Sequence, residues 1–154
     1  MGNPKINIAI DGYSGVGKST TAQMVAHELG YTFLDSGAMY RAVTWELLNR
    51  EVDLRDEDAV AESLETMSLE IDPDPVTHYY KLYLNGKPMD EELRERNTRD
   101  HVSKVAAISA VRKFLVQQQR EMGEEKGIVM DGRDIGTVVF PDAELKVFMT
   151  ADLE

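Results

Sequence analysis

One short segment near the start of the chain, Gly12–Ser19, limits what this sequence can fold into more than any other. It reads Gly12-Tyr13-Ser14-Gly15-Val16-Gly17-Lys18-Ser19, which fits the spacing G-x-x-x-x-G-K-[ST] at every fixed position. The apolar run Ile6–Ile10 before it predicts a buried strand, and the apolar positions of Lys18–Leu29 predict a helix that stops at Gly30. A strand, a glycine-rich loop and a helix in this order form the context in which such a loop binds phosphate groups.

The composition of this loop suits a chain of phosphate groups. Glycines let the backbone curl with its N–H groups pointing inward, and the N-terminus of the following helix adds a partial positive charge. We expect Gly12–Thr20 to hold the phosphates of a nucleoside triphosphate, with the Lys18 ammonium reaching the β and γ phosphates. The Ser19 hydroxyl is placed to ligate Mg²⁺. The loop leaves the second substrate open, because this fold carries many different chemistries.

Strands and helices alternate through most of the remaining chain, which predicts an α/β fold with a parallel sheet and helices on both faces. Further strands are expected at 31–34, 127–130 and 145–149, and helices at 36–50, 56–67 and 100–120, the last with a break near Ser109. The runs 69–71 and 78–84 also look like strands, and Asn85-Gly86 is typical of a tight hairpin turn. Residues 69–89 are therefore expected to form a small β insert.

Charged residues and glycines gather where three of the expected strands end. These ends are Asp11-Gly12, Asp35-Ser36-Gly37 and Asp131-Gly132-Arg133-Asp134. Ligands of parallel α/β sheets bind at the carboxyl ends of the strands, so we expect one site there.

The side chains near these strand ends suit an anion and a metal ion. Arg41 and Arg133 offer planar forks that match phosphate, and Asp131 can hold Mg²⁺ or orient its water shell. Two other interpretations remain open from the residues alone. Arg41 can be a surface arginine beside a plain helix cap, and Arg133 and Asp134 can belong to a turn that is closed by its own Arg–Asp pair.

The composition excludes several classes of function. The 154 residues contain no cysteine, which excludes disulfides and thiolate metal sites, and the 3 histidines lie too far apart to suggest a metal centre. No apolar run approaches the roughly 20 residues of a membrane helix, and the N-terminus does not resemble a signal peptide, so we expect a cytoplasmic protein without a membrane partner. A net charge of −11 argues against a nucleic-acid partner. The phosphate loop makes a small-molecule nucleotide the expected partner, and we expect a monomer, although the sequence leaves the oligomeric state open.

Three blocks of this sequence together resemble the bacterial-type cytidylate kinases. They are Ile8–Ser19, Leu34–Arg41 and Asp131–Pro141, in the order and approximate spacing of that family. The blocks D-S-G-A-x-Y-R and D-G-R-D-I-G-T-V-V-F-P are specific, whereas the phosphate loop alone is not. The resemblance runs through the helix Val105–Arg120 as well and covers nearly the whole chain. It implies a P-loop nucleoside-monophosphate-kinase fold with a core domain at 1–35 and 127–154 and an acceptor region at 36–126.

The resemblance also implies a reaction and the residues that carry it. ATP, with Mg²⁺, would donate its γ-phosphoryl group to CMP or dCMP, and Lys18, Arg41 and Arg133 would form the catalytic cationic set. Ser103, Arg112 and Asp134 would recognise the cytosine edge, since an aspartate accepts from the N4 amino group. The residues that would contact CMP are Ser36, Arg41, Arg94, Ser103, Arg112, Arg133 and Asp134. The assignment of Arg94 rests on a segment, 91–100, that matches the family only loosely.

In that family an arginine-rich lid, another core strand and a final helix follow the fourth strand. The sequence stops at Glu154, before any of these segments, so the expectation is nucleotide binding with little or no turnover. Two alternative functions stay open. One is a nucleotide-binding module without turnover, and the other is a kinase for a different small acceptor. The sequence does not distinguish a preference for CMP from one for dCMP.

Overall fold

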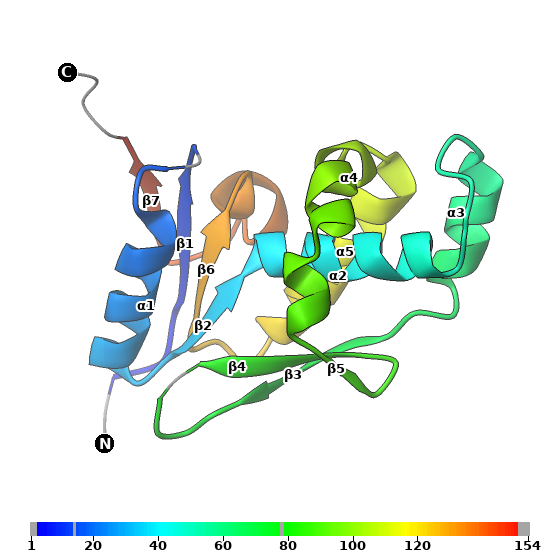
Figure 1. The fold of residues 1–154 in the computed structure, drawn as a ribbon. Coiled ribbons are helices and arrows are strands. Elements are labelled where there is room, and N and C mark those ends of the chain that lie inside the picture. The colour runs from blue at the N-terminus through cyan, green and yellow to red at the C-terminus, as the bar shows by residue number, and fades with distance from the viewer. Residues whose placement is uncertain (1–2, 14, 78, 151–154) are drawn as a thin grey trace. The chain divides into compact units, whose positions relative to one another are not determined.

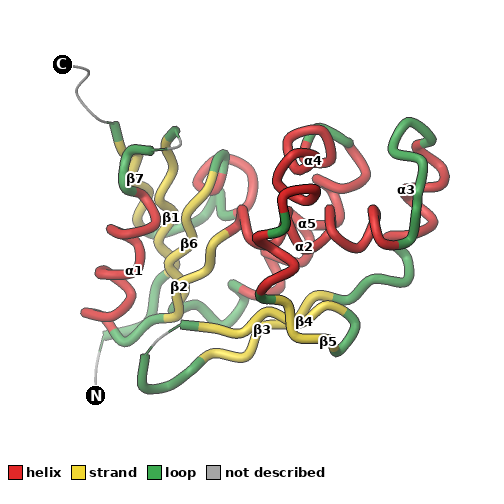
Figure 2. Tube along the Cα trace, viewed as in Figure 1, coloured by secondary structure: helices red, strands yellow, loops and turns green. Residues whose placement is uncertain are grey.

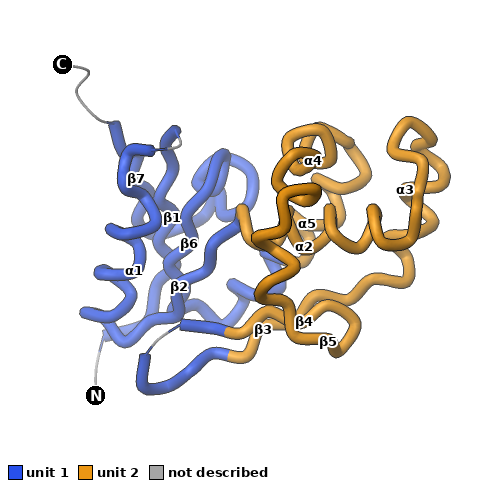
Figure 3. The backbone as a smooth tube through the Cα atoms, viewed as in Figure 1, with its two compact units in different colours: residues 1–36, 73–80, 119–154 blue, residues 37–72, 81–118 orange. Residues whose placement is uncertain are grey.

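The structure is a computed structural model that describes residues 3–13, 15–77 and 79–150. The chain divides into two compact units, which Figure 3 shows in blue and orange. Unit 1 contains residues 1–36, 73–80 and 119–154, and unit 2 contains residues 37–72 and 81–118. The phosphate-loop segment and the segment that follows Asp131 therefore both belong to unit 1.

Unit 1 is built on a parallel sheet of four strands (Figure 1 and Figure 2). The strands are β1 (Asn7–Gly12), β2 (Thr32–Asp35), β6 (Ile128–Gly132) and β7 (Leu145–Met149), in the spatial order β2-β6-β1-β7. β1 pairs in parallel with both β6 and β7, and β2 pairs in parallel with β6. The expected parallel α/β sheet is confirmed, with strand bounds that differ from the predicted ones by at most two residues.

The helix α1 (Lys18–Leu29) packs against this sheet (Figure 1). Its buried Ala22 and Ala26 lie in one apolar cluster with the sheet residues Ile8, Ile10, Phe33 and Val129. Alanines on the buried face let the helix approach the strands closely, which favours dense packing. The helix ends at Gly30 with a φ of 69°, a left-handed conformation that glycine adopts without strain. The predicted helix is confirmed at both of its ends.

A short helix that the sequence analysis did not predict follows β6. In η2 (Ile135–Val139), the N–H groups of Val139 and Phe140 donate to the carbonyls of Asp134 and Ile135, five residues earlier. This is the pattern of a π-helix, which occurs mostly as single turns. Five residues show no apolar period, so their sequence cannot distinguish such a turn from a strand or a loop. The Arg120 guanidinium donates to the carbonyls of Val138 at 2.6 Å and Val139 at 3.2 Å and so closes the far end of η2.

Unit 2 contains most of the remaining helical residues and most of a small sheet of order β3-β4-β5, whose residues Pro73 and Tyr80 belong to unit 1. The remaining elements of the chain are α2 (Ser36–Asn49), α3 (Glu57–Leu64), β3 (Leu69–Pro73), β4 (Tyr80–Leu84), β5 (Lys87–Met89), η1 (Glu91–Arg94), α4 (Arg96–Ala106) and α5 (Ser109–Met122). The gap between α4 and α5 confirms the break expected near Ser109. No helix in the described parts of the chain is long and apolar enough to cross a bilayer.

The β insert has the hairpin that its sequence predicts. β4 and β5 pair antiparallel, and the two residues between them, Asn85 and Gly86, have φ values of 50° and 79°. Two successive positive φ angles are the signature of a tight type I′ turn, for which Asn-Gly is the preferred sequence. The strand predicted to begin at His78 is found from Tyr80, and His78 itself lies outside the described residues.

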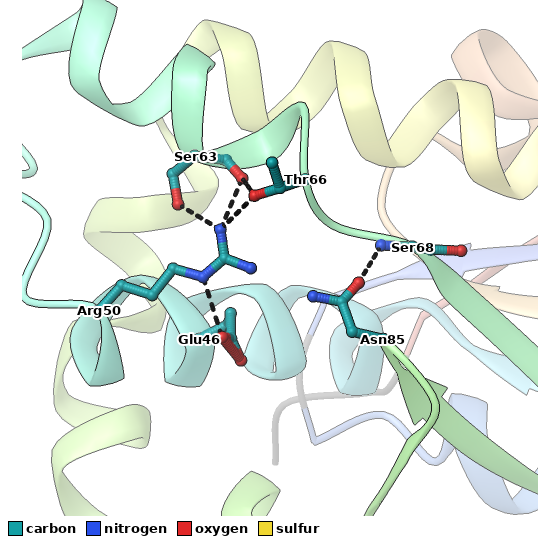
Figure 4. A network of polar contacts seen from close by, with 6 residues as sticks. All are labelled: Glu46, Arg50, Ser63, Thr66, Ser68 and Asn85. Carbon is teal, nitrogen blue, oxygen red and sulfur yellow. Dashed lines mark hydrogen bonds and ion pairs between the residues drawn. The ribbon is translucent and has the colours of Figure 1, made fainter.

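A polar network joins the end of α2 to the end of α3 within unit 2 (Figure 4). One nitrogen of the Arg50 guanidinium, Nη1, donates to the Ser63 carbonyl at 2.9 Å, the Ser63 hydroxyl at 3.1 Å and the Thr66 hydroxyl at 2.6 Å. The guanidinium also donates through Nε to Glu46 at 3.0 Å. Arg50 is half-buried, so these bonds are partly shielded from water. Arg50 thereby fixes the connection between the two helices.

Replacing Arg50 with methionine should destabilise unit 2 by about 1–3 kcal/mol, because the helix-end carbonyl and hydroxyls lose a charged donor. The measurement is urea unfolding followed by circular dichroism. The matched control is Arg55→Met, which removes an ion pair with Asp53 at 3.2 Å in which the arginine side chain is 86% exposed. Such a surface pair is worth about 0–1 kcal/mol. Equal effects of the two substitutions would contradict a structural role for the Arg50 network.

Candidate functional site

Three strands of the unit 1 sheet end next to one another in polar residues. The register places Asp35 of β2 opposite Asp131 of β6, and Asp11 of β1 opposite Gly132 of β6. Because all of these strands are parallel, their carboxyl ends meet at one edge of the sheet, where ligands of such folds bind. The register thus brings together the three strand ends that the sequence analysis singles out.

Three glycines at the end of β1 and before α1 have backbone angles that favour glycine. Gly12, Gly15 and Gly17 have φ values of 152°, 84° and 87°, which side chains rarely permit. A Cβ at Gly15 or Gly17 would meet no described atom within 4 Å, so open space lies beside both residues. The predicted contact residue Ser14 lies outside the described residues.

The start of α1 presents donors and a cation to this space. The first intrahelical bond runs from Thr21 N–H to the Gly17 carbonyl at 3.0 Å, so the N–H groups of the three residues before Thr21 have no acceptor inside the helix. No acidic side chain lies in the first turn, and Gly17 caps the helix without a side-chain bond. The Lys18 ammonium donates to the Tyr13 carbonyl at 3.2 Å and is therefore folded back over the loop. This arrangement suits an anion with several oxygen atoms.

The two residues expected to hold Mg²⁺ both carry oxygen ligands, which this ion prefers. The Ser19 hydroxyl lies in the first turn of α1, where the Gln23 amide donates to it at 3.4 Å. The Asp131 side chain is 5% exposed and stands near the end of β6, between β1 and β2. In the described residues, no group of three or more His, Cys, Asp or Glu side chains could hold a metal ion. Mg²⁺ at this edge would therefore need phosphate oxygens or water to complete its shell, which is its usual manner of binding.

The turn after β6 carries the exposed side chains of Arg133 and Asp134. Asp134 has a φ of 60°, a left-handed conformation that is uncommon for a residue with a side chain. Gly132 lies two residues before Asp134. A Cβ built on Gly132 would overlap the Ser36 hydroxyl and would lie 3.0 Å from the Ile135 side chain. Ser36 is buried at 5% exposure. The lack of a side chain at position 132 is thus what lets the Ser36 hydroxyl lie against this turn.

Replacing Gly132 with alanine should therefore destabilise unit 1 by about 1–3 kcal/mol and move the Ser36 hydroxyl away from the turn. The double variant Gly132→Ala with Ser36→Ala removes the overlapping hydroxyl and should recover part of the lost stability. Thermal unfolding of the two single variants and the double variant measures this coupling. Additive losses would show that the two residues do not compete for the same space.

Four of the residues expected to contact the acceptor lie in unit 2. Arg41 is half-buried in α2, whereas Ser103 on α4 and Arg112 on α5 are exposed. Arg94 is the last residue of η1 and forms an exposed ion pair with Asp90 at 3.1 Å. Their side chains reach the surface of unit 2, and their roles toward a ligand remain predictions.

Two side chains of unit 1 make hydrogen bonds at this edge that the sequence analysis did not predict, although it placed Asp11 at one of the strand ends of the expected site. The Asp11 carboxylate accepts hydrogen bonds from the N–H groups of Ile135 at 2.7 Å and Gly136 at 2.9 Å. The Tyr80 hydroxyl accepts from the Asp35 N–H at 3.3 Å and donates to the Asp35 carbonyl at 3.4 Å. The place of Asp11 directly before the loop glycine put it at the site, but it did not indicate which groups its carboxylate binds. No local pattern connects Tyr80 with a residue 45 positions away.

Comparison with known proteins identifies the family. A family model described as "Cytidylate kinase" matches residues 8–154. The chain is 52% identical to the cytidylate kinase of Flavobacterium psychrophilum, over 97% of this chain and 68% of that protein. It is 49% identical to the cytidylate kinase of Flavobacterium johnsoniae, over 97% of this chain and 66% of that protein. For the cytidylate kinase of Bacteroides thetaiotaomicron the identity is 48%, over 97% of this chain and 67% of the relative.

The chain thus spans about two thirds of the length of the curated relatives it matches. The match includes the phosphate loop, the turn after β6 and the segments of unit 2 between them. On this evidence the chain belongs to the cytidylate kinase family.

Proposed function

We propose that this protein transfers the γ-phosphoryl group of ATP to CMP or dCMP. The observation that carries the proposal is the shared sheet edge of unit 1. There the phosphate loop follows β1, and the turn with Arg133 and Asp134 follows β6, the strand paired with β1. Membership of the cytidylate kinase family supports a nucleotide as acceptor.

On the donor side, the protein binds and aligns the triphosphate. The N–H groups of the loop and of the first turn of α1 hold the phosphate oxygens, and the Lys18 ammonium moves from the Tyr13 carbonyl to the β and γ phosphates. Ser19 and Asp131 would hold Mg²⁺, which when bound neutralises charge on the transferred group. A phosphate oxygen of CMP forms the new bond to the γ phosphorus as the bond to the β-phosphate oxygen of ATP breaks. The products are CDP and ADP, and no strong general base is required.

On the acceptor side, we assign the recognition of cytosine to Asp134 together with Ser103 and Arg112. The carboxylate accepts from the N4 amino group of cytosine, while the serine and arginine donate to N3 and O2. Uracil has a carbonyl at that place, and two facing acceptors cost about 1–3 kcal/mol. Arg41 and Arg133 hold the CMP phosphate, and Ser36 and Arg94 line the pocket. These assignments rest on the family blocks of the sequence.

The test is a coupled assay of ADP formation with CMP, dCMP, UMP and AMP as acceptors. It uses the native-length protein, that is, the whole product of the native gene. Calorimetry with ATP·Mg measures donor binding separately. CMP or dCMP should be the best acceptor. Binding of ATP·Mg without turnover on any acceptor would favour a binding module, and faster turnover with UMP or AMP would point to a different kinase.

Replacing Asp134 with alanine should lower kcat/KM for CMP by roughly 10–100-fold, because the N4 amino group loses a charged acceptor. The dissociation constant of ATP·Mg should stay near that of the unchanged protein. The matched control is Asp142→Ala, which removes another exposed aspartate of unit 1. If kcat/KM for CMP and the affinity for ATP·Mg fell by the same factor, this result would count against the assignment of Asp134 to the cytosine edge.

A further inference from the structure

The side chain of Asp11 connects two segments that are far apart in sequence. Asp11 is the residue directly before Gly12, where the phosphate loop begins, and its side chain is half-buried. One carboxylate oxygen accepts from the Ile135 N–H at 2.7 Å, and the other accepts from the Gly136 N–H at 2.9 Å. The two donors lie 124 and 125 residues further along the chain. Bonds of this length to an ionised acceptor are among the stronger hydrogen bonds in proteins.

These contacts hold both ends of the turn that carries Arg133 and Asp134. At the start of the turn, the backbone of Asp11 is in register with Gly132 of β6. At its end, the Asp11 carboxylate binds Ile135, which is 1% exposed, and Gly136, which is also buried. Only the two exposed residues of the turn lie between these points. The pairing of β1 with β6 at Asp11 and the hydrogen bonds of the Asp11 carboxylate thus hold this turn at both of its ends.

The backbone of the turn needs such support. Asp134 has a φ of 60°, a left-handed conformation that aspartate adopts more readily than most side chains but still less readily than glycine. Without the Asp11 carboxylate, the N–H groups of Ile135 and Gly136 would lose their acceptors in a partly buried place. The turn could then relax to a conformation in which its two side chains point elsewhere.

We propose that Asp11 is a positioning residue for phosphoryl transfer. Its carboxylate sets the placement of Arg133 and Asp134 with respect to the phosphate loop, while the loop itself binds ATP without it. This inference rests on the proposed function, because it assigns the acceptor contacts to that turn. It leads to a specific expectation, namely that loss of the Asp11 carboxylate weakens binding and recognition of CMP much more than binding of ATP·Mg.

The test compares Asp11→Asn with Asp74→Asn in the native-length protein. An asparagine keeps one acceptor oxygen but turns an N–H donor toward the second backbone donor, so one of the two bonds is lost. Asp74 is a matched control, since its carboxylate also accepts two backbone N–H bonds in unit 1, from Val76 at 2.8 Å and Thr77 at 3.2 Å, in an exposed turn.

For Asp11→Asn we expect KM for CMP to rise roughly tenfold or more and the preference for CMP over UMP to fall, because a lost charged hydrogen bond has about that effect. The dissociation constant of ATP·Mg and the Mg²⁺ requirement should remain close to those of the unchanged protein. A merely structural role would lower the melting temperature without changing the ratio of CMP to UMP turnover. Asp74→Asn should leave all of these quantities unchanged.

Amide hydrogen exchange provides a readout that does not depend on activity. In Asp11→Asn the amides of Ile135 and Gly136 should exchange faster, while those of β6 should keep their protection. If Asp11→Asn does not fold, Asp11→Ser removes both carboxylate oxygens without adding bulk or an amide donor, and it should raise KM for CMP in the same way.

Three outcomes would contradict the positioning role of Asp11. They also distinguish a failure of this role from a failure of the proposed function. An unchanged KM and selectivity in Asp11→Asn, with the normal protein phosphorylating CMP, would overturn the positioning role alone. A raised Mg²⁺ requirement with unchanged CMP kinetics would make Asp11 a metal-site residue instead. If the normal protein does not phosphorylate CMP, the proposed function fails. If amide exchange at Ile135 and Gly136 is then also unchanged in Asp11→Asn, the Asp11 carboxylate does not hold the turn either.

Discussion

Replacing Gly12 with alanine should abolish triphosphate binding and destabilise unit 1 by about 3 kcal/mol. A Cβ at this position would lie 2.6 Å from the Met149 carbonyl oxygen and 3.3 Å from the Lys18 side chain. Gly12 is also paired in register with Met149, so the obstacle is the backbone of the neighbouring strand. No change of side-chain rotamer can relieve this overlap. The pairing of β1 with β7 has to shift, and the loop that follows Gly12 shifts with it.

The control for Gly12→Ala is Gly86→Ala in the β4–β5 hairpin. Gly86 also has a positive φ, 79°, but a Cβ there would meet no described atom within 4 Å. This variant should therefore show only the conformational cost of a left-handed residue, about 1–2 kcal/mol, with normal ATP·Mg binding. Urea unfolding gives the stability of both variants, and calorimetry gives the affinity for ATP·Mg. Normal binding in Gly12→Ala would show that the close approach to Met149 does not shape the loop.

Lys18→Met should lower kcat/KM for ATP by about 10²–10³-fold, the usual loss when one group that stabilises transition-state charge is removed. The methionine retains the apolar stem of this half-buried side chain but not the ammonium that is folded over the loop toward the Tyr13 carbonyl. Folding does not depend on that single contact at 3.2 Å, so the melting temperature should stay the same. The loss should therefore appear in turnover and donor affinity rather than in stability.

Steady-state kinetics of the native-length protein measures this effect, with Lys113→Met as the control. Lys113 is an exposed lysine of α5, and its substitution removes the same charge from the surface of unit 2. It should leave kcat/KM unchanged. If kcat/KM for ATP fell by less than about tenfold in Lys18→Met, the backbone N–H donors would be sufficient to stabilise the negative charge of the phosphates without the ammonium.

The sequence by itself determined the features whose physical causes are local. The spacing of Gly12–Ser19, the apolar run before it and the helical period after it predict the strand, loop and helix that the structure contains. The hairpin at Asn85-Gly86 followed in the same way, because only residues that tolerate positive φ form such a tight turn. Alternation of strands and helices was sufficient for the parallel sheet. The acceptor residues of unit 2 were predicted from family blocks, and their roles still require the experiments above.

Only the tertiary structure decided how distant segments meet at the edge of the sheet. It showed that the Asp11 carboxylate binds two amides more than 120 residues away, and that the Ser36 hydroxyl occupies the space a side chain at Gly132 would need. It also revealed η2, in which the Asp134 and Ile135 carbonyls accept from N–H groups five residues later and Arg120 donates to the carbonyls of the last two residues. The physical reason is the same in each case. A hydrogen bond or a steric contact depends on which atoms face each other after the strands have paired, and the local pattern of residue types carries no information about that.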